Sequence, residues 1–321
     1  MELYQIKGQA KRLPGEMDLN FRLTSHDNGK NYLLKISYPD PDEGFMAFQE
    51  AIYDHLAASK ILNARPTLLY APDGRRHCTF RDDERKNRVA KLMSWIPGIE
   101  ILKVQPKSKE LLYNLGAEAG KVIQALEHFD HPFAHRAFRW DLSQGAWTFA
   151  YTSFFETKEQ VLIRYFQDGF TAILPKLNDA RKGVIHGDLN SNNILASIDN
   201  KDPNKVAIID YGDAIHTALI NDLAIALTDT MLGSPEPLEK AKWLIMGYHK
   251  HFPLLEDEIK LLYQLIGMRL VIILVQFVIY PIEPGKECLF TLKKQAWELL
   301  FYWRNLEEET AFSFFKEAAL G

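Results

Sequence analysis

The chain of 321 residues is poor in cysteine, has no excess of basic charge and contains no long apolar segment. Its two cysteines, Cys78 and Cys288, lie far apart in the sequence and provide neither a metal-binding spacing nor a disulfide framework. Such sparse cysteine usage is typical of the reducing cytosol. The net charge of −4 argues against a basic surface for nucleic acid.

Targeting and membrane-spanning patterns are also lacking. The first residues have no apolar core of a signal peptide, so we expect a cytoplasmic protein. The most apolar run, residues 270–280, is shorter than the roughly 20 residues that cross a bilayer. Lys260 and Arg269 interrupt its extension, so we predict a buried helix and no membrane partner.

The composition that remains is that of a globular protein. Hydrophobic residues make up 47% of the chain and charged residues 25%, which is ordinary for a domain with a sizeable core. The length exceeds that of one average domain, which favours two units or one large unit.

One stretch, residues 184–213, carries most of the chemical information. It begins with His-Gly-Asp at 186–188, continues to Asn193 and a short apolar run, and ends with a β-branched run before Asp210. Two short strands joined by a turn would bring Asp188, Asn193 and Asp210 to one end of a hairpin.

These three side chains suit phosphoryl transfer. Mg²⁺ takes oxygen ligands and shares its site with substrate phosphates. The reaction requires mainly positioning and neutralisation of charge. We therefore predict Asp188 as the catalytic base and Asn193 and Asp210 as the Mg²⁺ ligands.

The motif resembles the catalytic core of the aminoglycoside phosphotransferase and choline kinase superfamily, relatives of protein kinases. The Asp-to-Asn spacing is that of the protein-kinase catalytic loop. Gly187 stands where protein kinases have Arg, and Tyr211 where they have Phe. The resemblance implies a two-lobed α+β fold, with an antiparallel sheet in the small lobe, a mainly helical large lobe and the active site between them.

The small lobe should supply a phosphate-binding lysine. Strands are expected at 20–25 and 32–38, separated by an Asn-Gly turn, with a helix following from about 41 to 56. By resemblance, Lys35 in the second strand grips the phosphates and Glu50 in the helix holds it in an ion pair. Without that context, Lys35 is an outward-facing strand lysine and Glu50 a solvated carboxylate.

The turn at 13–16, Leu-Pro-Gly-Glu, is expected to lie over the nucleotide and to bind it through Gly15. It contains one glycine rather than a full glycine-rich loop. With the strand motif LLKIS, the FRWDL run at 138–142 and the DLAIA run at 222–226, this turn resembles the hydroxylysine kinase branch of the superfamily.

Residues 94–98 are expected to form a hinge between an N-lobe at 1–93 and a C-lobe at 99–321. In kinase-like folds the adenine ring bonds to backbone groups of the hinge, which leaves no side-chain pattern. Ser94 and Ile96 are therefore assigned to the nucleotide by position alone.

The C-lobe pattern is helical over residues 143–178, with further helices expected at 236–251, 256–280 and 288–318. Asp222 is expected to tie down the catalytic loop or to cap a helix. A loop carries His131 and His135, and we expect no metal site there because nearby carboxylates at ligand spacing are lacking. The WDL motif that this loop shares with the hydroxylysine kinase branch implies a structural or substrate-wall role.

Arg269 and Asp213 are the two candidate contacts for the acceptor. Arg269 lies on an apolar face, where it either pairs with a core carboxylate or binds a substrate carboxylate. Asp213 either binds a substrate ammonium or supports the metal site.

The predicted activity is transfer of the γ-phosphate of ATP or GTP to a hydroxyl of an amino alcohol or hydroxy amino acid, with hydroxylysine as the nearest candidate. An aminoglycoside or homoserine acceptor is the alternative within the enzyme class, and a nucleotide-binding pseudokinase the alternative outside it. The acceptor, the nucleotide base and the oligomeric state stay open.

Overall fold

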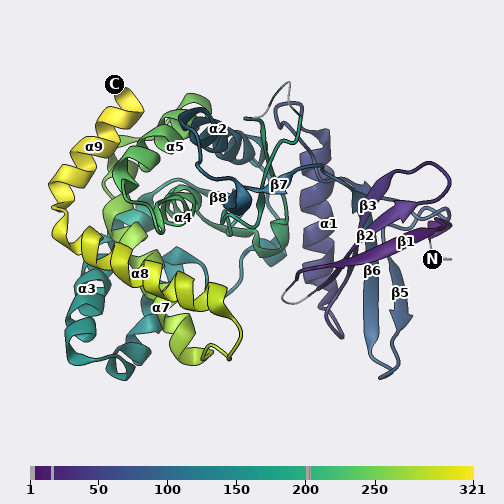
Figure 1. Cartoon of the computed structure of the whole chain (residues 1–321), viewed down its shortest axis with the longest axis horizontal. Helices are drawn as coiled ribbons and strands as arrows, with labels where there is room; N and C mark the ends of the chain where they lie inside the picture. The colour runs from purple at the N-terminus through teal and green to yellow at the C-terminus, as the bar shows by residue number, and fades with distance from the viewer. Residues whose placement is uncertain (1–3, 16–17, 200–201, 203) are drawn as a thin grey trace. The chain divides into compact units, whose positions relative to one another are not determined.

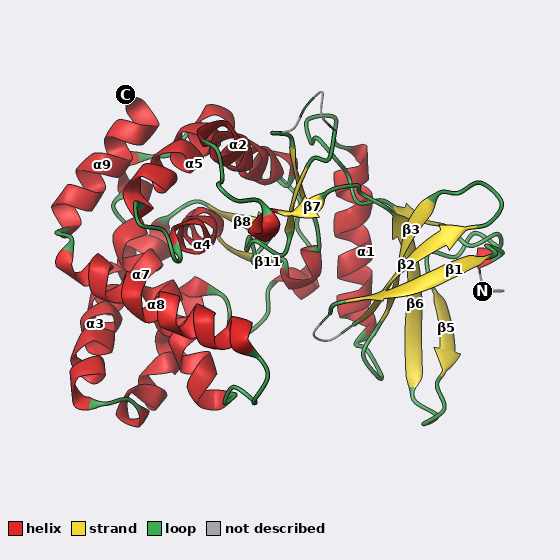
Figure 2. Cartoon of the chain, viewed as in Figure 1, coloured by secondary structure: helices red, strands yellow, loops and turns green. Residues whose placement is uncertain are grey.

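The computed structural model describes residues 4–15, 18–199, 202 and 204–321. The chain forms a small unit, Met1–Pro97 with His131–Phe133, and a large unit, Gly98–Asp130 with Ala134–Gly321. Figure 1 follows the chain through them, and Figure 2 shows strands concentrated in the small unit and helices in the large one. The predicted α+β class is therefore confirmed. A hinge at 94–98 between lobes at 1–93 and 99–321 stays a prediction.

The small unit is an antiparallel sheet with one helix. The strand order is β1-β2-β3-β6-β4, and β5 pairs with β6. The strands are β1 (Gly8–Leu13), β2 (Leu19–Ser25), β3 (Asn31–Ile36), β4 (Leu68–Leu69), β5 (Cys78–Arg81) and β6 (Asn87–Ser94). Because β1 precedes the turn at 13–16, that turn joins two strands rather than leading into the first one.

The core of the small unit lies on one face of this sheet. Leu23, Leu34 and Leu92 are buried there with Cys78, and the hydroxyl of Tyr4 donates to the carbonyl of Ala90 at 3.0 Å. Helix α1 (Glu43–Ala58) begins at Asp42, whose carboxylate accepts from the amide of Phe45 at 2.8 Å. This side-chain cap satisfies an amide that has no partner within the helix.

The large unit contains two short antiparallel sheets. One pairs β8 (Lys182–Ile185) with β11 (Ile215–Ala218), and the other has the order β10-β9-β7. Its strands are β7 (Ile99–Glu100), β9 (Ile194–Ala196) and β10 (Val206–Ile208). Since Ile194 lies opposite Ile208, the segments before β9 and after β10 meet at one end of the hairpin.

Helices make up the rest of the large unit. The long ones are α2 (Lys109–Ala125), α3 (Thr157–Asp179), α4 (Ile220–Met231), α5 (Pro237–His251), α7 (Leu262–Ile279), α8 (Glu287–Asn305) and α9 (Glu308–Leu320). The short ones are α6 (Glu256–Ile259), η2 (Ile101–Lys103), η3 (Pro132–Ala134, which spans the boundary between the units), η4 (Leu142–Phe154) and η5 (Tyr211–Asp213). Helix α7 packs against η4, α3, α4, α8 and α9, so it is the centre of this unit.

Two predicted helices are each interrupted. The segment 143–178 contains the 3₁₀ helix η4 and then α3, which begins where the Glu159 carboxylate accepts from the amide of Glu156 at 3.0 Å. The segment 288–318 breaks between α8 and α9. There the hydroxyl of Tyr263 donates to the carbonyls of Trp303 and Leu306 at 3.0 and 3.1 Å, which stabilises the end of α8.

The apolar run at 270–280 belongs to a longer helical segment. In the described part of the chain, Glu256–Ile279 is the one helical segment whose 24 residues are long and apolar enough to span a membrane. The expectation that Lys260 and Arg269 interrupt the extension of the run is therefore wrong. Its most apolar window is 78% buried, however, and Leu270–Ile272 are fully buried, as the prediction of a core helix requires.

Candidate active site

The loop between β8 and β9 is anchored by a buried carboxylate. Asp222, at the start of α4, accepts from the amide of His186 at 3.0 Å and from the amide of Gly187 at 2.9 Å. Burial raises the pKa of the Asp222 carboxyl, and the two backbone donors oppose that shift. The interpretation that Asp222 ties down the catalytic loop is confirmed.

His186 links this loop to the second strand of the hairpin. Its ring is fully buried, lies 4.7 Å from the ring of Tyr211, and bonds through Nε2 to the carbonyl of Ile209 at 2.9 Å. Its Nδ1 accepts from the amide of Asp188 at 3.2 Å. His186 therefore positions the loop, as expected.

Asp188 is oriented by three side chains. Its Oδ2 accepts from Nδ2 of Asn190 at 2.7 Å and from Nδ2 of Asn193 at 2.8 Å. Its Oδ1 lies 3.5 Å from Nη2 of Arg269. The side chain keeps 24% of its exposure, so the carboxylate is fixed in direction and still accessible.

Asn193 and Asp210 approach each other through the backbone. The amide of Ile209 donates to the carbonyl of Asn193 at 2.9 Å, which places Asp210 directly beside it. Nδ2 of Asn193 is used by the carbonyl and the carboxylate of Asp188, so its Oδ1 is the atom left to face a cation. The hairpin thus brings together the three residues that the sequence predicted.

This donor set fits Mg²⁺. An amide oxygen and a carboxylate are hard ligands, and Asn193 is held with the correct atom outward. When bound, Mg²⁺ would neutralise the charge of the transferred phosphates. The assignment of Asn193 and Asp210 as its ligands stays a prediction.

Gly187 explains one departure from protein kinases. Its φ is +83°, and a Cβ added there would lie 2.5 Å from the carbonyl oxygen of Asp213. A side chain such as Arg would meet both a disfavoured backbone conformation and a steric clash. Asp210 also has a positive φ, 63°, which is uncommon for a non-glycine residue.

Asp213 lies in the electrostatic field of the same carboxylates. Burial raises its pKa to about 6, and the negative charges of Asp188 and Asp210 add to that shift while Arg136 opposes it. A cation near Asp213 would lower its pKa again. The side chain therefore suits the predicted contact with a substrate ammonium, a role that stays a prediction.

Arg269 is buried beside Asp188, with 6% of its surface exposed. Its guanidinium lies over the ring of Trp140, 4.8 Å from the centroid, and Nη2 approaches Asp188. Nη1 has no hydrogen-bond partner among the described residues. Arg269 therefore approaches Asp188, a half-buried carboxylate of the site rather than one of the core, while one donor of the guanidinium remains for a ligand.

In the small unit, the predicted pairing of Lys35 with Glu50 stays a prediction, and both side chains also contact other groups. Nζ of Lys35 lies 3.7 Å from Asp18, while Glu50 lies 3.8 Å from Nζ of Lys91 and 2.6 Å from Nδ1 of His77. Lys91 is opposite Lys35 in the β3–β6 register and is 5% exposed, so it reaches Glu50 from deeper in the unit.

Lys91 is the functional candidate that sequence reasoning missed. Burial lowers its pKa to about 8 despite the nearby charge of Glu50. Lys35 and Lys91 line the same small cavity with Asp18. Lys35 was selected because it lies between two apolar residues in a strand. The same pattern is present at Ala90-Lys91-Leu92.

The remaining nucleotide candidates keep their positions without a tested role. At Gly15 a Cβ would lie 2.7 Å from Nδ2 of Asn20, so the β1–β2 turn folds back tightly. Glu16 of that turn lies outside the described residues. Oγ of Ser94 accepts from the amide of Thr67 at 3.0 Å, and Ile96 follows β6 half-buried.

A sequence model described as the phosphotransferase enzyme family matches residues 9–249. The chain belongs to this family. The phosphotransferase is similar to hydroxylysine kinase of Xenopus laevis, with 25% identity over 99% of this chain and 91% of the relative. It is also similar to hydroxylysine kinase of Mus musculus, with 28% identity over 67% of this chain and 60% of the relative.

Solved structures share the fold of this phosphotransferase. Amicoumacin kinase hAmiN, in complex with AMP-PNP, Ca²⁺ and Ami, has a TM-score of 0.71 at 16% identity, over 96% of this chain and 93% of its own. A microcompartment-associated aminopropanol kinase has a TM-score of 0.67 at 18% identity, over 99% and 96%. The predicted two-lobed kinase-like fold is confirmed. The protein is a small-molecule kinase that phosphorylates a hydroxyl group with a nucleotide as co-substrate.

Proposed function

We propose that this kinase transfers the γ-phosphoryl group of ATP or GTP to the hydroxyl of a hydroxylated amino acid, with hydroxylysine as the first candidate. Relatives named hydroxylysine kinase support this acceptor. The observation that carries the proposal is the buried Nη1 of Arg269, which lies in the group that also approaches the catalytic Asp188.

Arg269 supplies the recognition of a carboxylate. A buried donor without a partner costs roughly 1–3 kcal/mol. A substrate carboxylate on Nη1 removes that cost, and the planar guanidinium matches a carboxylate geometrically. Trp140 supports the other face of the guanidinium and limits its movement.

Asp213 supplies the recognition of an ammonium. Burial raises the pKa of its carboxyl and the charges of Asp188 and Asp210 raise it further, so a cation relieves part of this shift. A zwitterionic amino acid with a hydroxyl group carries both complementary charges. An amino alcohol carries only one of them, so we expect it to be the weaker acceptor.

The chemical roles follow from the geometry of the loop. Asp188 accepts the proton of the acceptor hydroxyl, and Asn190 and Asn193 hold its carboxylate in place. Asn193 and Asp210 hold Mg²⁺, and Lys35 holds the nucleotide phosphates. We expect this reaction to take place in the cytoplasm.

An aminoglycoside acceptor is disfavoured by how the acidic residues are used. A polycationic aminoglycoside would require an acidic cleft, which several carboxylates between 229 and 258 would have to form together. Asp229 is bonded to Oγ of Ser191, and Glu258 to Arg181 with Nε–Oε1 at 2.7 Å. Glu256 and Asp257 are exposed and pair with Lys260. Few carboxylates are thus left for a polycation.

The test is a matched acceptor screen with ATP and GTP in parallel. It compares hydroxylysine and homoserine with the amino alcohols that lack only the carboxylate, and with an aminoglycoside. We expect kcat/KM for each amino acid to exceed that for the matching amino alcohol by at least about tenfold, equivalent to 1.4 kcal/mol. The Arg269→Met variant should lose this preference. Preference for an aminoglycoside contradicts the proposal. Nucleotide binding without turnover of any of these acceptors contradicts the proposed acceptor class as well.

A further inference from the structure

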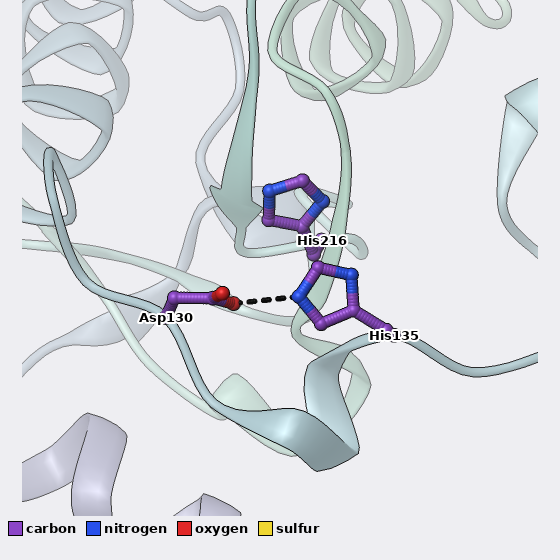
Figure 3. A group of neighbouring side chains, drawn as sticks. All are labelled: Asp130, His135 and His216. Atoms are coloured by element: carbon purple, nitrogen blue, oxygen red, sulfur yellow. Dashed lines mark hydrogen bonds and ion pairs between the residues drawn. The ribbon is translucent and has the colours of Figure 1, made fainter.

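Three ligand-type side chains meet in the large unit outside the site described above. Asp130 follows α2, His135 follows η3, and His216 lies in β11 (Figure 3). Nε2 of His135 bonds to Oδ1 of Asp130 at 2.8 Å, and the rings of His135 and His216 stack with centroids 4.2 Å apart. One potential ligand atom from each lies within 4.8 Å of the others.

The donor set is that of a transition metal rather than of Mg²⁺. Imidazole nitrogen binds Zn²⁺ strongly, and an additional carboxylate oxygen is a common third ligand. Mg²⁺ prefers a shell of oxygen atoms only. A cation here would therefore differ in kind from the one expected at Asn193 and Asp210.

The charge state of the cluster favours a cation. Burial lowers the pKa of His216, and the adjacent His135 lowers it further, because two stacked imidazoles resist a shared positive charge. His216 is therefore a neutral donor near pH 7. Asp130 supplies the negative charge that a divalent ion requires.

The three side chains must move closer together to bind one ion. Ligands of a tetrahedral Zn²⁺ bind at about 2.0–2.2 Å from the metal, which requires them to converge from their present separation. The side chains of Asp130 and His135 are 59% and 48% exposed, so neither is locked by packing. Solvent is also available for the remaining coordination position.

We propose that Asp130, His135 and His216 bind a divalent transition-metal ion of the Zn²⁺ class, with water as the fourth ligand. Such an ion would restrain the chain on both sides of residues 131–133. Asp130 and His135 stand just outside the segment 131–133, which belongs to the small unit although the chain on both sides belongs to the large one. A bound ion would join both ends of that segment to β11.

The experiment is titration of the full-length protein with Zn²⁺, followed by calorimetry in millimolar Mg²⁺. Every sample carries Cys288→Ser, because this exposed thiol could bind Zn²⁺ itself. We expect one Zn²⁺ per chain. Loss of a ligand in His216→Ala or His135→Ala should weaken binding by at least about tenfold, and Asp130→Asn should weaken it also. Co²⁺ in place of Zn²⁺ should give tetrahedral absorption bands that these variants lose.

His26→Ala is the matched control, since it removes an exposed histidine on the β2–β3 turn, far from the cluster in sequence. Circular dichroism confirms that each variant folds. The proposal is overturned if the double variant His135→Ala/His216→Ala binds Zn²⁺ with unchanged affinity, or if the parent protein binds none at micromolar concentration. Neither outcome depends on the acceptor of the kinase.

Discussion

At the scale of single residues, the carboxylate of Asp188, the proposed base, is held in place by Asn190, Asn193 and Arg269. Asp188→Asn keeps the shape and removes the charge, so kcat should fall by roughly 10²–10⁴ while nucleotide affinity changes little. Steady-state kinetics on the acceptor found by the screen measures this. Asp168→Asn, an exposed carboxylate of α3, is the control and should leave kcat unchanged. Near-normal turnover by Asp188→Asn, with chemistry rate-limiting, would exclude Asp188 as the catalytic base.

Substitutions of Lys35 and Lys91 in the small unit should have different effects. If Lys35 binds the phosphates, Lys35→Met raises KM for nucleotide and leaves the melting temperature nearly unchanged. Lys91→Met removes the buried partner of Glu50, so its main effect should be on stability. Kinetics and thermal melts of both variants decide between them. The opposite result assigns the phosphates to Lys91, and Glu50→Gln should then affect KM as well.

Asp213 predicts a specific dependence on pH. Its folded-state pKa of about 6 is above the ordinary value of 3.8, so the folded protein holds this proton more tightly than the unfolded chain does. The resulting stability is present below about pH 4 and is lost as the pH rises to 6. In EDTA at pH 7.5, Asp213→Asn should raise the free energy of unfolding by roughly 1–2 kcal/mol. Denaturant melts at several pH values measure the difference, which should shrink towards pH 4. A difference that does not change with pH contradicts the prediction.

At the scale of elements, the β8–β9 loop and the end of η5 approach too closely for a side chain at position 187. Gly285→Ala, at φ +86° with nothing within 4 Å of the added Cβ, should cost only the left-handed backbone penalty of roughly 1–2 kcal/mol. Gly187→Ala adds the clash with Asp213, roughly 1–3 kcal/mol more. Chemical denaturation of the two variants compares the costs directly. Equal costs would show that the loop moves away freely.

The β9–β10 hairpin was predictable because its β-branched second strand and its polar ends are adjacent in the sequence. The start of α2 was predictable for the same local reason, since Oγ of Ser108 caps the amide of Leu111 at 3.1 Å. Strand β1 was not, because almost all of its residues are exposed and no apolar alternation marks it. Its pairing with β2 decides its conformation.

Features that depend on distant residues escaped prediction. The break between α8 and α9 is stabilised by Tyr263, which lies in another helix. The contact between Lys91 and Glu50 also escaped prediction, because it depends on the β3–β6 register that places Lys91 opposite Lys35. The third side chain of the metal-type cluster, His216, comes from a strand far from Asp130 in the chain.

At the scale of the whole molecule, stability should be uneven. Nearly all of α7 is buried and five other helical elements pack against it, so its backbone opens only when the large unit unfolds. Hydrogen exchange followed by mass spectrometry should find the α7 peptides slowest of this unit. Faster exchange of α7 than of α9, at the C-terminal end of the chain, would contradict this hierarchy.

The small unit is discontinuous in sequence, because it includes the segment 131–133. His131 stacks on Phe48 at 5.4 Å, and a Cβ at Gly44 would meet the ring of Phe133, so these residues complete the surface of α1. The chain therefore passes between units at 97/98, 130/131 and 133/134. A recombination that exchanges residues 1–97 between family members transfers α1 without the residues that cover it. A functional chimera must therefore take the segment 131–133 and α1 from the same parent. For the same reason, the residues of these two segments must change together in evolution.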